Sequence, residues 1–260
     1  MKYIILTLIF TVSLFGQIQN HHLSVLKKRG TVAGSTYPSI VYTDTVSVDG
    51  FSGAGTAGAD LTFTHWGSIQ ANDLILLLLT HEDGIPAPWS STSDVSEAGY
   101  TFMYCNGNNG GVAVGGFYKV AAGTESGTFT VTASTAQEQV GAYIIVRGAN
   151  TTDPIDSIGA FVLVDPAATG IDVVGVATAN NYSLVIGHVM FNGSDWASLA
   201  WGGTGWNLFT AVGQRTNNGN TASIQWGYKF QETAGASGTI NVTNTTSDIW
   251  GGRQFSVNPE

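Results

Sequence analysis

One pattern of apolar strands with a Tyr-Lys pair occurs twice in this chain, about 110 residues apart. The first copy comprises residues 74–79 (LILLLL), 116–120 (GFYKV) and 127–132 (GTFTVT). The second copy has the same order at residues 184–186 (LVI), 226–230 (WGYKF) and 238–243 (GTINVT). A repeated succession of short strand patterns is typical of duplicated architectures. The sequence therefore predicts that two halves of the chain adopt equivalent β-structures.

The periodicity of these patterns predicts which faces are buried. Residues 74–79 form an unbroken apolar run, so both faces of this strand should be covered. Residues 127–132 alternate instead, which directs Phe129 and Val131 toward the core and the threonines toward solvent. We predict an all-β fold, an antiparallel β-sandwich that is internally duplicated and has an extended or helical N-terminal segment before it.

Further strands are expected wherever short β-branched or aromatic stretches lie between Gly, Asn, Asp and Ser clusters. In the first half the remaining strands are predicted at residues 40–48, 60–64, 99–104, 112–120 and 140–147. In the second half they are predicted at residues 158–163, 184–191, 206–211, 224–230, 239–244 and 249–257. No helical stripe competes with this pattern.

The chain is predicted to divide into four segments. These are an apolar N-terminal segment at residues 1–17, a linker at 18–38, a first β-sandwich repeat at 39–160 and a second at 161–260. Two arrangements of the repeats are compatible with the sequence: two tandem sandwiches, or one sandwich fused from two related halves.

Residues 1–17 resemble a short secretory signal. Lys2 is followed by an apolar stretch that ends at Gly16-Gln17, where cleavage would be expected. The stretch is too short for a comfortable membrane span, so no stable transmembrane span is expected. The alternative interpretation is an uncleaved arm that docks into a partner assembly.

Charge argues against nucleic acid as a partner. Four basic residues precede every acidic residue: Lys2, Lys27, Lys28 and Arg29. From residue 31 onward the chain contains the other 5 of its 9 basic residues and all 18 acidic residues, which gives this part a net charge of −13. Such a body repels phosphate backbones. The single cysteine, Cys105, has no intrachain partner for a disulfide.

Several of these motifs together resemble a diffuse group of β-sandwich proteins found in bacteriophage structural modules. The resembling segments are residues 72–76 (NDLIL), 116–120 (GFYKV), 127–131 (GTFTV), 146–148 (VRG) and 153–156 (DPID). Where the group carries Gly-Asp before its first strand, this chain has Asn72-Asp73. The resemblance implies a jelly-roll-like or immunoglobulin-like sandwich in a virion or surface appendage, and it brings no catalytic residues with it.

No catalytic or metal-binding motif stands out in the sequence. The densest polar cluster, at residues 81–84 (HEDG), is interpreted as a turn, and Asp153 and Asp156 are interpreted as part of a connector. Adjacent residues on an extended chain point to opposite faces, and no second histidine completes a metal site at His81. We therefore expect no enzyme activity, no metal and no cofactor.

Three tryptophans are the candidate ligand-binding residues. Trp89 follows a Pro-Ala-Pro stretch, while Trp196 and Trp201 lie in a stretch rich in Gly and Ser. Exposed indoles in such loops could stack on the sugar rings of a cell-surface glycan or anchor a neighbouring subunit. The alternative is that they close the ends of the sandwich from inside. Trp206 is predicted to be core because it aligns with Tyr100.

The function expected from these features is that of a non-enzymatic structural protein of a virion, a phage capsid-surface, tail or fibre component. Its partners would be further copies of itself or other virion or appendage subunits. The alternative is a secreted bacterial surface or filament protein, or a carbohydrate-binding module, located outside the cell or on its surface.

Overall fold

The computed structural model divides the chain into two compact units, Met1–Thr36 and Tyr37–Glu260. It describes residues 37–48, 60–82, 87–108, 111–135, 137–192, 200–209 and 222–260. The predicted apolar segment at 1–17 and most of the predicted linker lie outside the described residues. All of the described strands belong to the second unit.

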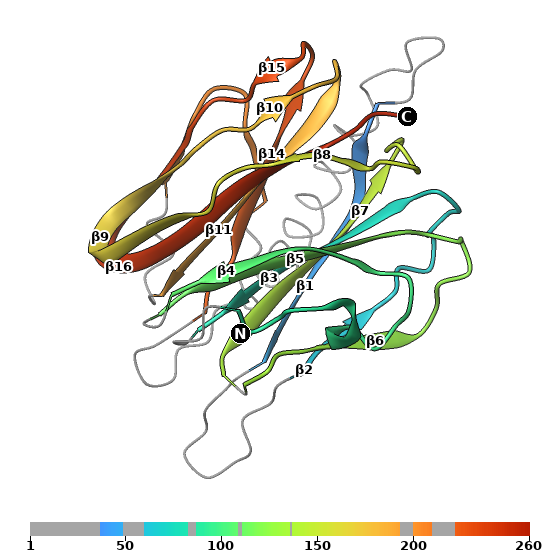
Figure 1. Ribbon diagram of the computed structural model, residues 1–260, viewed down its shortest axis with the longest axis horizontal. Helices are drawn as coiled ribbons and strands as arrows, with labels where there is room; N and C mark the ends of the chain where they lie inside the picture. Colours follow the sequence, from blue (N-terminus) through green and yellow to red (C-terminus); the bar gives the residue numbers. More distant parts are fainter. Residues whose placement is uncertain are drawn as a thin grey trace, which may run out of the picture. The chain divides into compact units, whose positions relative to one another are not determined.

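The first half of this unit forms a five-stranded antiparallel sheet (Figure 1). Its strands lie in the order β1 (Ser39–Val48), β7 (Gln139–Arg147), β3 (Leu74–His81), β5 (Ala113–Val120) and β4 (Thr101–Gly107). A short 3-10 helix, η1 (Thr92–Asp94), precedes β4, and a two-stranded sheet of β2 (Asp60–Thr64) and β6 (Thr128–Thr132) accompanies the main sheet.

The second half forms a seven-stranded antiparallel sheet. Its path runs through β12 (Ala200–Gly202), β16 (Ile240–Val257), β11 (Ser183–Asn192), β14 (Gln225–Gln231) and β13 (Asn207–Phe209). The strands β8 (Ile155–Ile158) and β9 (Val162–Val173) also pair with β16. A separate two-stranded sheet consists of β10 (Ala177–Thr178) and β15 (Gly235–Ala236).

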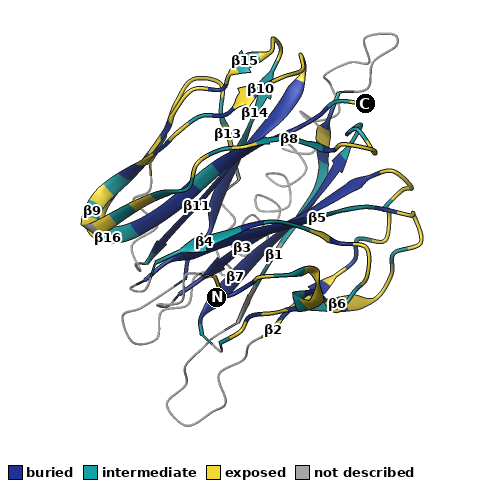
Figure 2. Cartoon of the chain, in the orientation of Figure 1, coloured by how far each residue is buried: buried dark blue, intermediate teal, exposed yellow. Residues whose placement is uncertain are grey.

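The buried strand β3 supplies apolar side chains to two cores. Leu74, Leu76 and Leu78 join the core between the two large sheets, which also contains Ile186 and Phe255. The alternate residues of β3 lie in a second core under β2 and β6, and every residue of β3 is buried (Figure 2). The prediction that both faces of this strand are covered is therefore confirmed. The two sheets share one core, so the described residues form a single sandwich.

The outer sheet of β2 and β6 also matches the predicted alternation. Leu61 and Phe63 of β2 pair with Val131 and Phe129 of β6, and all four side chains are buried. Thr128 and Thr132 are exposed. The amphipathic strands thus cover the outer face of the first large sheet, as period-two patterning requires.

The paired strands β9 and β16 form a bent ribbon that covers the outer face of the second large sheet. The register between β9 and β16 shifts between Thr243 and Asp248, where the ribbon turns. Ile171 and Val242 beyond the turn then pack with Phe191 of β11 in a third core. The predicted strands at 239–244 and 249–257 are thus one continuous strand with an irregular middle.

Strand pairing in the two halves corresponds residue by residue. Leu74 of β3 pairs with Val120 and Val146, and its counterpart Leu184 of β11 pairs with Phe230 and Val257. The outer pairs correspond too: Leu61 with Val131 in the first half, and Ile171 with Val242 in the second. This correspondence is what a duplication would produce, and the duplication stays a prediction.

One detail differs from the predicted boundaries. The strand predicted at 158–163 is wrong: β8 ends at Ile158 and β9 begins at Val162, with Gly159 between them. A side chain at Gly159 would meet Val176 at 2.9 Å, so the chain passes closely over its neighbours there. Because β8 pairs with β16, residues 155–158 already belong to the second sheet, and the predicted division of the repeats at residue 160 stays a prediction.

Candidate functional site

Trp89 is fully buried, which corrects the prediction that it offers an exposed indole. Its ring lies edge-on to His81, with ring centroids 5.7 Å apart. A Cβ atom at Gly115 of β5 would come within 2.6 Å of the Trp89 ring, so the glycine makes room for the indole. Burying this large apolar ring favours the fold more than exposing it.

Of the other two candidate tryptophans, Trp196 and Trp201, the structure describes only Trp201. Trp201 is partly buried and packs with Trp206 against the third core, with ring centroids 6.1 Å apart. Trp206, predicted to be core by alignment with Tyr100, is also only partly buried. Trp196 lies outside the described residues. A ligand-binding role for Trp196 and Trp201 stays a prediction.

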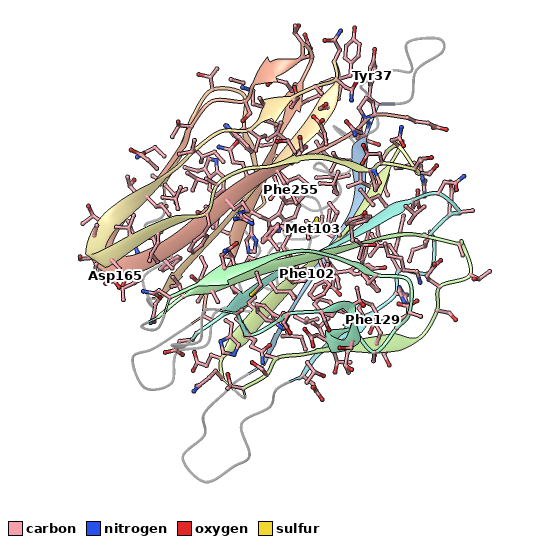
Figure 3. The ribbon with its side chains drawn as sticks, viewed as in Figure 1. Tyr37, Phe102, Met103, Phe129, Asp165 and Phe255 are labelled. Carbon is pink, nitrogen blue, oxygen red and sulfur yellow. The ribbon has the colours of Figure 1, made fainter. Side chains whose placement is uncertain are left out.

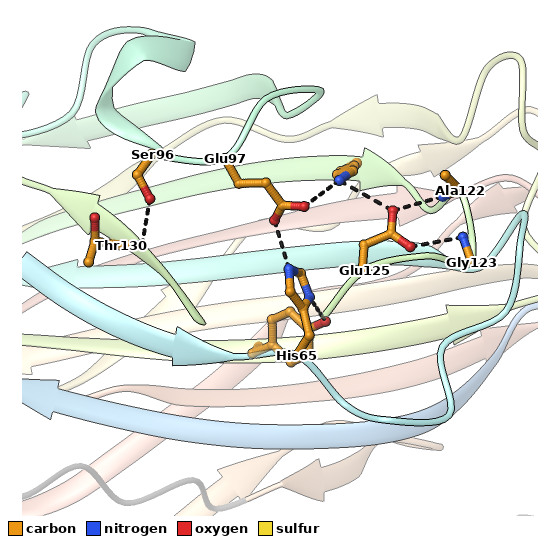
Figure 4. A network of polar contacts seen from close by, with 9 residues as sticks. His65, Ser96, Glu97, Ala122, Gly123, Glu125 and Thr130 are labelled. Carbon is orange, nitrogen blue, oxygen red and sulfur yellow. Dashed lines mark hydrogen bonds and ion pairs between the residues drawn. The ribbon is translucent and has the colours of Figure 1, made fainter. Parts of the chain in front are cut away.

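A polar network joins His65, which follows β2 of the outer sheet, to strands β5 and β7 of the first large sheet (Figure 4). The His65 ring bonds the Tyr143 hydroxyl through Nδ1 at 3.0 Å and the Glu97 carboxylate through Nε2 at 2.8 Å. Lys119 Nζ donates to Glu97 at 2.6 Å and lies 3.2 Å from Glu125. Each charge therefore has an opposite charge beside it. The network is better suited to fastening loops than to chemistry on a substrate.

Glu125 is the anchor at one end of this network. Its two carboxylate oxygens accept hydrogen bonds from the backbone N–H groups of Ala122 and Gly123, both at 2.8 Å. Burial alone would raise the pKa of Glu125, but backbone hydrogen bonds and Lys119 outweigh it and lower the pKa to about 2. The carboxylate is thus a structural anion that holds the turn before β6.

A second ion pair ties β7 to the turn before β3. Arg147 donates two hydrogen bonds of 2.7 Å to the carboxylate of Asp73, which is 1% exposed. Asp73 also accepts from the backbone N–H of Gln70 at 2.8 Å. This two-point geometry is the strongest form of an arginine–carboxylate contact. The Asp73 and Arg147 of the family resemblance therefore have a structural role.

A different kind of polar centre lies between the two large sheets. His188 of β11 is fully buried, and the Tyr104 hydroxyl lies 3.2 Å from its Nδ1. The guanidinium of Arg253, on β16, lies 4.8 Å from the centroid of the Tyr104 ring. Met103 and Phe255, both labelled in Figure 3, pack in the core around this centre. We name Tyr104, His188 and Arg253 the inter-sheet polar centre.

Burial controls the protonation of this centre. It raises the pKa of Tyr104 well above its ordinary value, so the phenol keeps its proton. For His188, burial first and the nearby Arg253 second lower the pKa to about 3. The imidazole is therefore neutral at physiological pH, and Arg253 carries the centre's positive charge. Sequence reasoning missed the centre because its residues come from three strands far apart in the chain.

An aromatic cluster lies on the surface at the start of the described unit. The ring of Tyr37 lies 4.4 Å from Tyr182 and 5.3 Å from Phe230, measured between centroids. Tyr182 is 38% exposed and has a positive φ of 64°, a conformation that a bulky residue rarely adopts. At the corresponding turn of the first half stands Asn72, with a φ of 73°. Asparagine tolerates this conformation more readily.

A scan against protein-family models, a search of curated proteins and a search of solved structures each found no match for this chain. Among the described residues, no helix is long and apolar enough to cross a membrane. In the same part of the chain, no group of three or more His, Cys, Asp or Glu side chains is placed to hold a metal ion.

Proposed function

We propose that this chain is a non-enzymatic structural protein of a virion, a phage capsid-surface, tail or fibre component that acts through contacts between subunits. The observation that carries the proposal is the layering of the fold. The outer faces of both large sheets are covered by the chain's own strands, β2 and β6 on one and the bent ribbon of β9 and β16 on the other. In the described ranges, the surfaces that this layering leaves for partners are strand edges and turns.

The outermost strands are the favoured contact elements. Among the described strands, β4 and β1 end the first sheet, and β13 ends the second sheet beside β14. Such strands present unpaired backbone N–H and C=O groups, which a strand from another subunit can satisfy. Backbone pairing of this kind needs little charge, which suits a chain with only 10% charged residues.

Mass spectrometry of purified particles tests the proposal. The chain should be present in many copies at a fixed ratio to the other particle proteins, and a soluble monomer that is missing from particles would rule the proposal out. A matched pair of variants tests the role of β4. Thr101→Lys adds a charge to this outermost strand and should reduce incorporation into particles, because a charged side chain on such a strand opposes its pairing with a strand of another subunit. Ser68→Lys, at an exposed turn, should incorporate normally.

The aromatic cluster of Tyr37, Tyr182 and Phe230 favours a second candidate function, a secreted surface protein that binds a glycan. Exposed aromatic rings stack on the apolar faces of sugars, and the Tyr182 ring of this cluster is 38% exposed. N-terminal sequencing of the native protein separates the two functions. A start near Gln17 supports secretion, whereas an intact Met1 supports the particle.

A further inference from the structure

From the inter-sheet polar centre we infer a binding site for a single carboxylate, held by Arg253 and His188 and completed by Tyr104. The site does not depend on the proposed structural function. Four observations support it: the pairing of the two residues across neighbouring strands, their apolar counterparts in the other half, their orphaned donors, and the charge of the site.

Strand register places the two key side chains together. His188 and Arg253 are direct partners in the antiparallel pairing of β11 and β16. Paired residues on neighbouring strands project to the same face of the sheet, here the face toward the opposite sheet. Tyr104 reaches them from β4, and Gly116 makes this possible because a Cβ atom there would lie 3.0 Å from the Tyr104 ring.

The fold itself does not need polar residues at these positions. In the first half, the register counterparts of His188 and Arg253 are Leu78 and Ala142, which pair with each other in the same way and are fully buried. One half therefore builds the equivalent region from apolar side chains alone. A buried histidine and a partly buried arginine are more costly to bury than Leu and Ala. Their presence indicates a role other than packing.

Each of the two residues has a buried nitrogen that lacks a partner within the described part of the chain. Arg253 Nε and His188 Nε2 are inaccessible to solvent, and neither forms a hydrogen bond with a described residue. Tyr104 keeps its proton and can donate it to His188 Nδ1, which leaves the hydrogen of the neutral ring on Nε2. Under this assignment both orphaned atoms are donors, so the group that satisfies them must be an acceptor.

The charge of the site indicates an anion. The described ion pairs engage His65, Lys119 and Arg147, and none includes Arg253. Arg147 shows the contrast, because Asp73 fully engages its guanidinium. A single guanidinium matches the planar, singly charged carboxylate, whereas the net charge of −9 disfavours a phosphate dianion. Arg253 is partly exposed, which gives the ligand a route to the buried donors.

The test uses the full chain and acetate as the probe. Arginine Nε–H signals are followed by ¹H–¹⁵N correlation spectroscopy while sodium acetate replaces sodium chloride at constant ionic strength. The Arg253 signal, assigned by its absence from Arg253→Ala, should shift saturably with acetate. Acetate should also raise the unfolding temperature, and the apparent acetate affinity should fall roughly tenfold or more in Arg253→Ala and His188→Leu. Arg147→Ala, a control that removes an arginine already paired, should keep the acetate response.

Each result of this test decides something. A saturable shift with free acetate supports a site for a small carboxylate. A shift of the same signal only in assembled particles, measured by solid-state spectroscopy, supports a carboxylate from a neighbouring subunit. An Arg253 signal that responds equally to acetate and chloride, and that stays unchanged in particles, overturns the inference. If Arg253→Ala does not fold, Arg253→Lys provides the assignment, and the wild-type titration remains decisive.

Discussion

Replacing His188 with leucine should remove a large part of the acid sensitivity of this fold. The imidazole has a pKa of about 3 in the folded chain, against an ordinary value of 6.5, because it is fully buried and lies beside Arg253. Between these values the unfolded chain binds a proton that the folded chain does not. The contribution to stability is therefore complete above pH 6.5 and declines as the pH falls toward 3.

The size of the effect can be worked out from the two pKa values. One pKa unit corresponds to about 1.4 kcal/mol, so at pH 5 the wild type should have lost about 2 kcal/mol through His188 relative to pH 8. Any folded-state pKa of His188 below about 4 gives nearly the same loss of stability at pH 5. At that pH the folded chain then binds almost no proton at His188, so the pKa of the histidine in the unfolded chain determines the size of the loss. The leucine variant should lack this loss. Leucine fits the position because Leu78 occupies its counterpart in the first sheet.

Urea unfolding at pH 8 and pH 5 measures the effect. The quantity compared between wild type and variant is the change in the free energy of unfolding from pH 8 to pH 5. Losing the partner of the Tyr104 hydroxyl should destabilise His188→Leu at both pH values alike. The double variant His188→Leu with Tyr104→Phe controls for this, and it should show the same weak pH dependence at higher stability. If the wild type and His188→Leu lose equal stability between pH 8 and pH 5, the imidazole is not both buried and neutral in the folded chain.

Three further outcomes are expected. Glu125→Gln should flatten the dependence of stability on pH between pH 4.5 and 2. The wild-type carboxylate has a pKa of about 2, so its stabilising contribution is lost as the pH falls through this window. Acid titration followed by circular dichroism measures the difference between wild type and variant. Leu77→Ala should lower the free energy of unfolding by about 2–5 kcal/mol in urea, since the side chain is fully buried in the core under β2 and β6. Asn72→Ala should cost about 1 kcal/mol in the same assay and Asn72→Gly much less, because the positive φ of 73° penalises a Cβ atom; equal effects of the two would refute backbone strain as the cause.

The parts of the fold that the sequence predicted were those with local signals. The unbroken apolar run at Leu74 and the alternation around Phe129 each report burial directly, because side-chain period reveals which faces are covered. The resulting all-β antiparallel sandwich is the observed architecture. The bend in the ribbon of β9 and β16 has no such signal, since it depends on packing against Phe191 of a different strand.

The candidate sites depended on long-range contacts and were harder to predict. Trp89 looked like a loop residue because it follows two prolines, yet the space beside Gly115 determines its burial. The pair of His188 and Arg253 becomes visible only once the register of β11 and β16 is known. One signal was available from the sequence: aligning the two copies places polar residues opposite Leu78 and Ala142.

Hydrogen–deuterium exchange of the backbone, compared between the free chain and assembled particles, tests most directly whether strand edges carry the function. Amides of the outermost strands, β1, β4 or β13, should gain protection in particles while the covered strands β3 and β11 stay unchanged. Identical exchange of the outermost strands in both states would contradict a role for these edges in assembly.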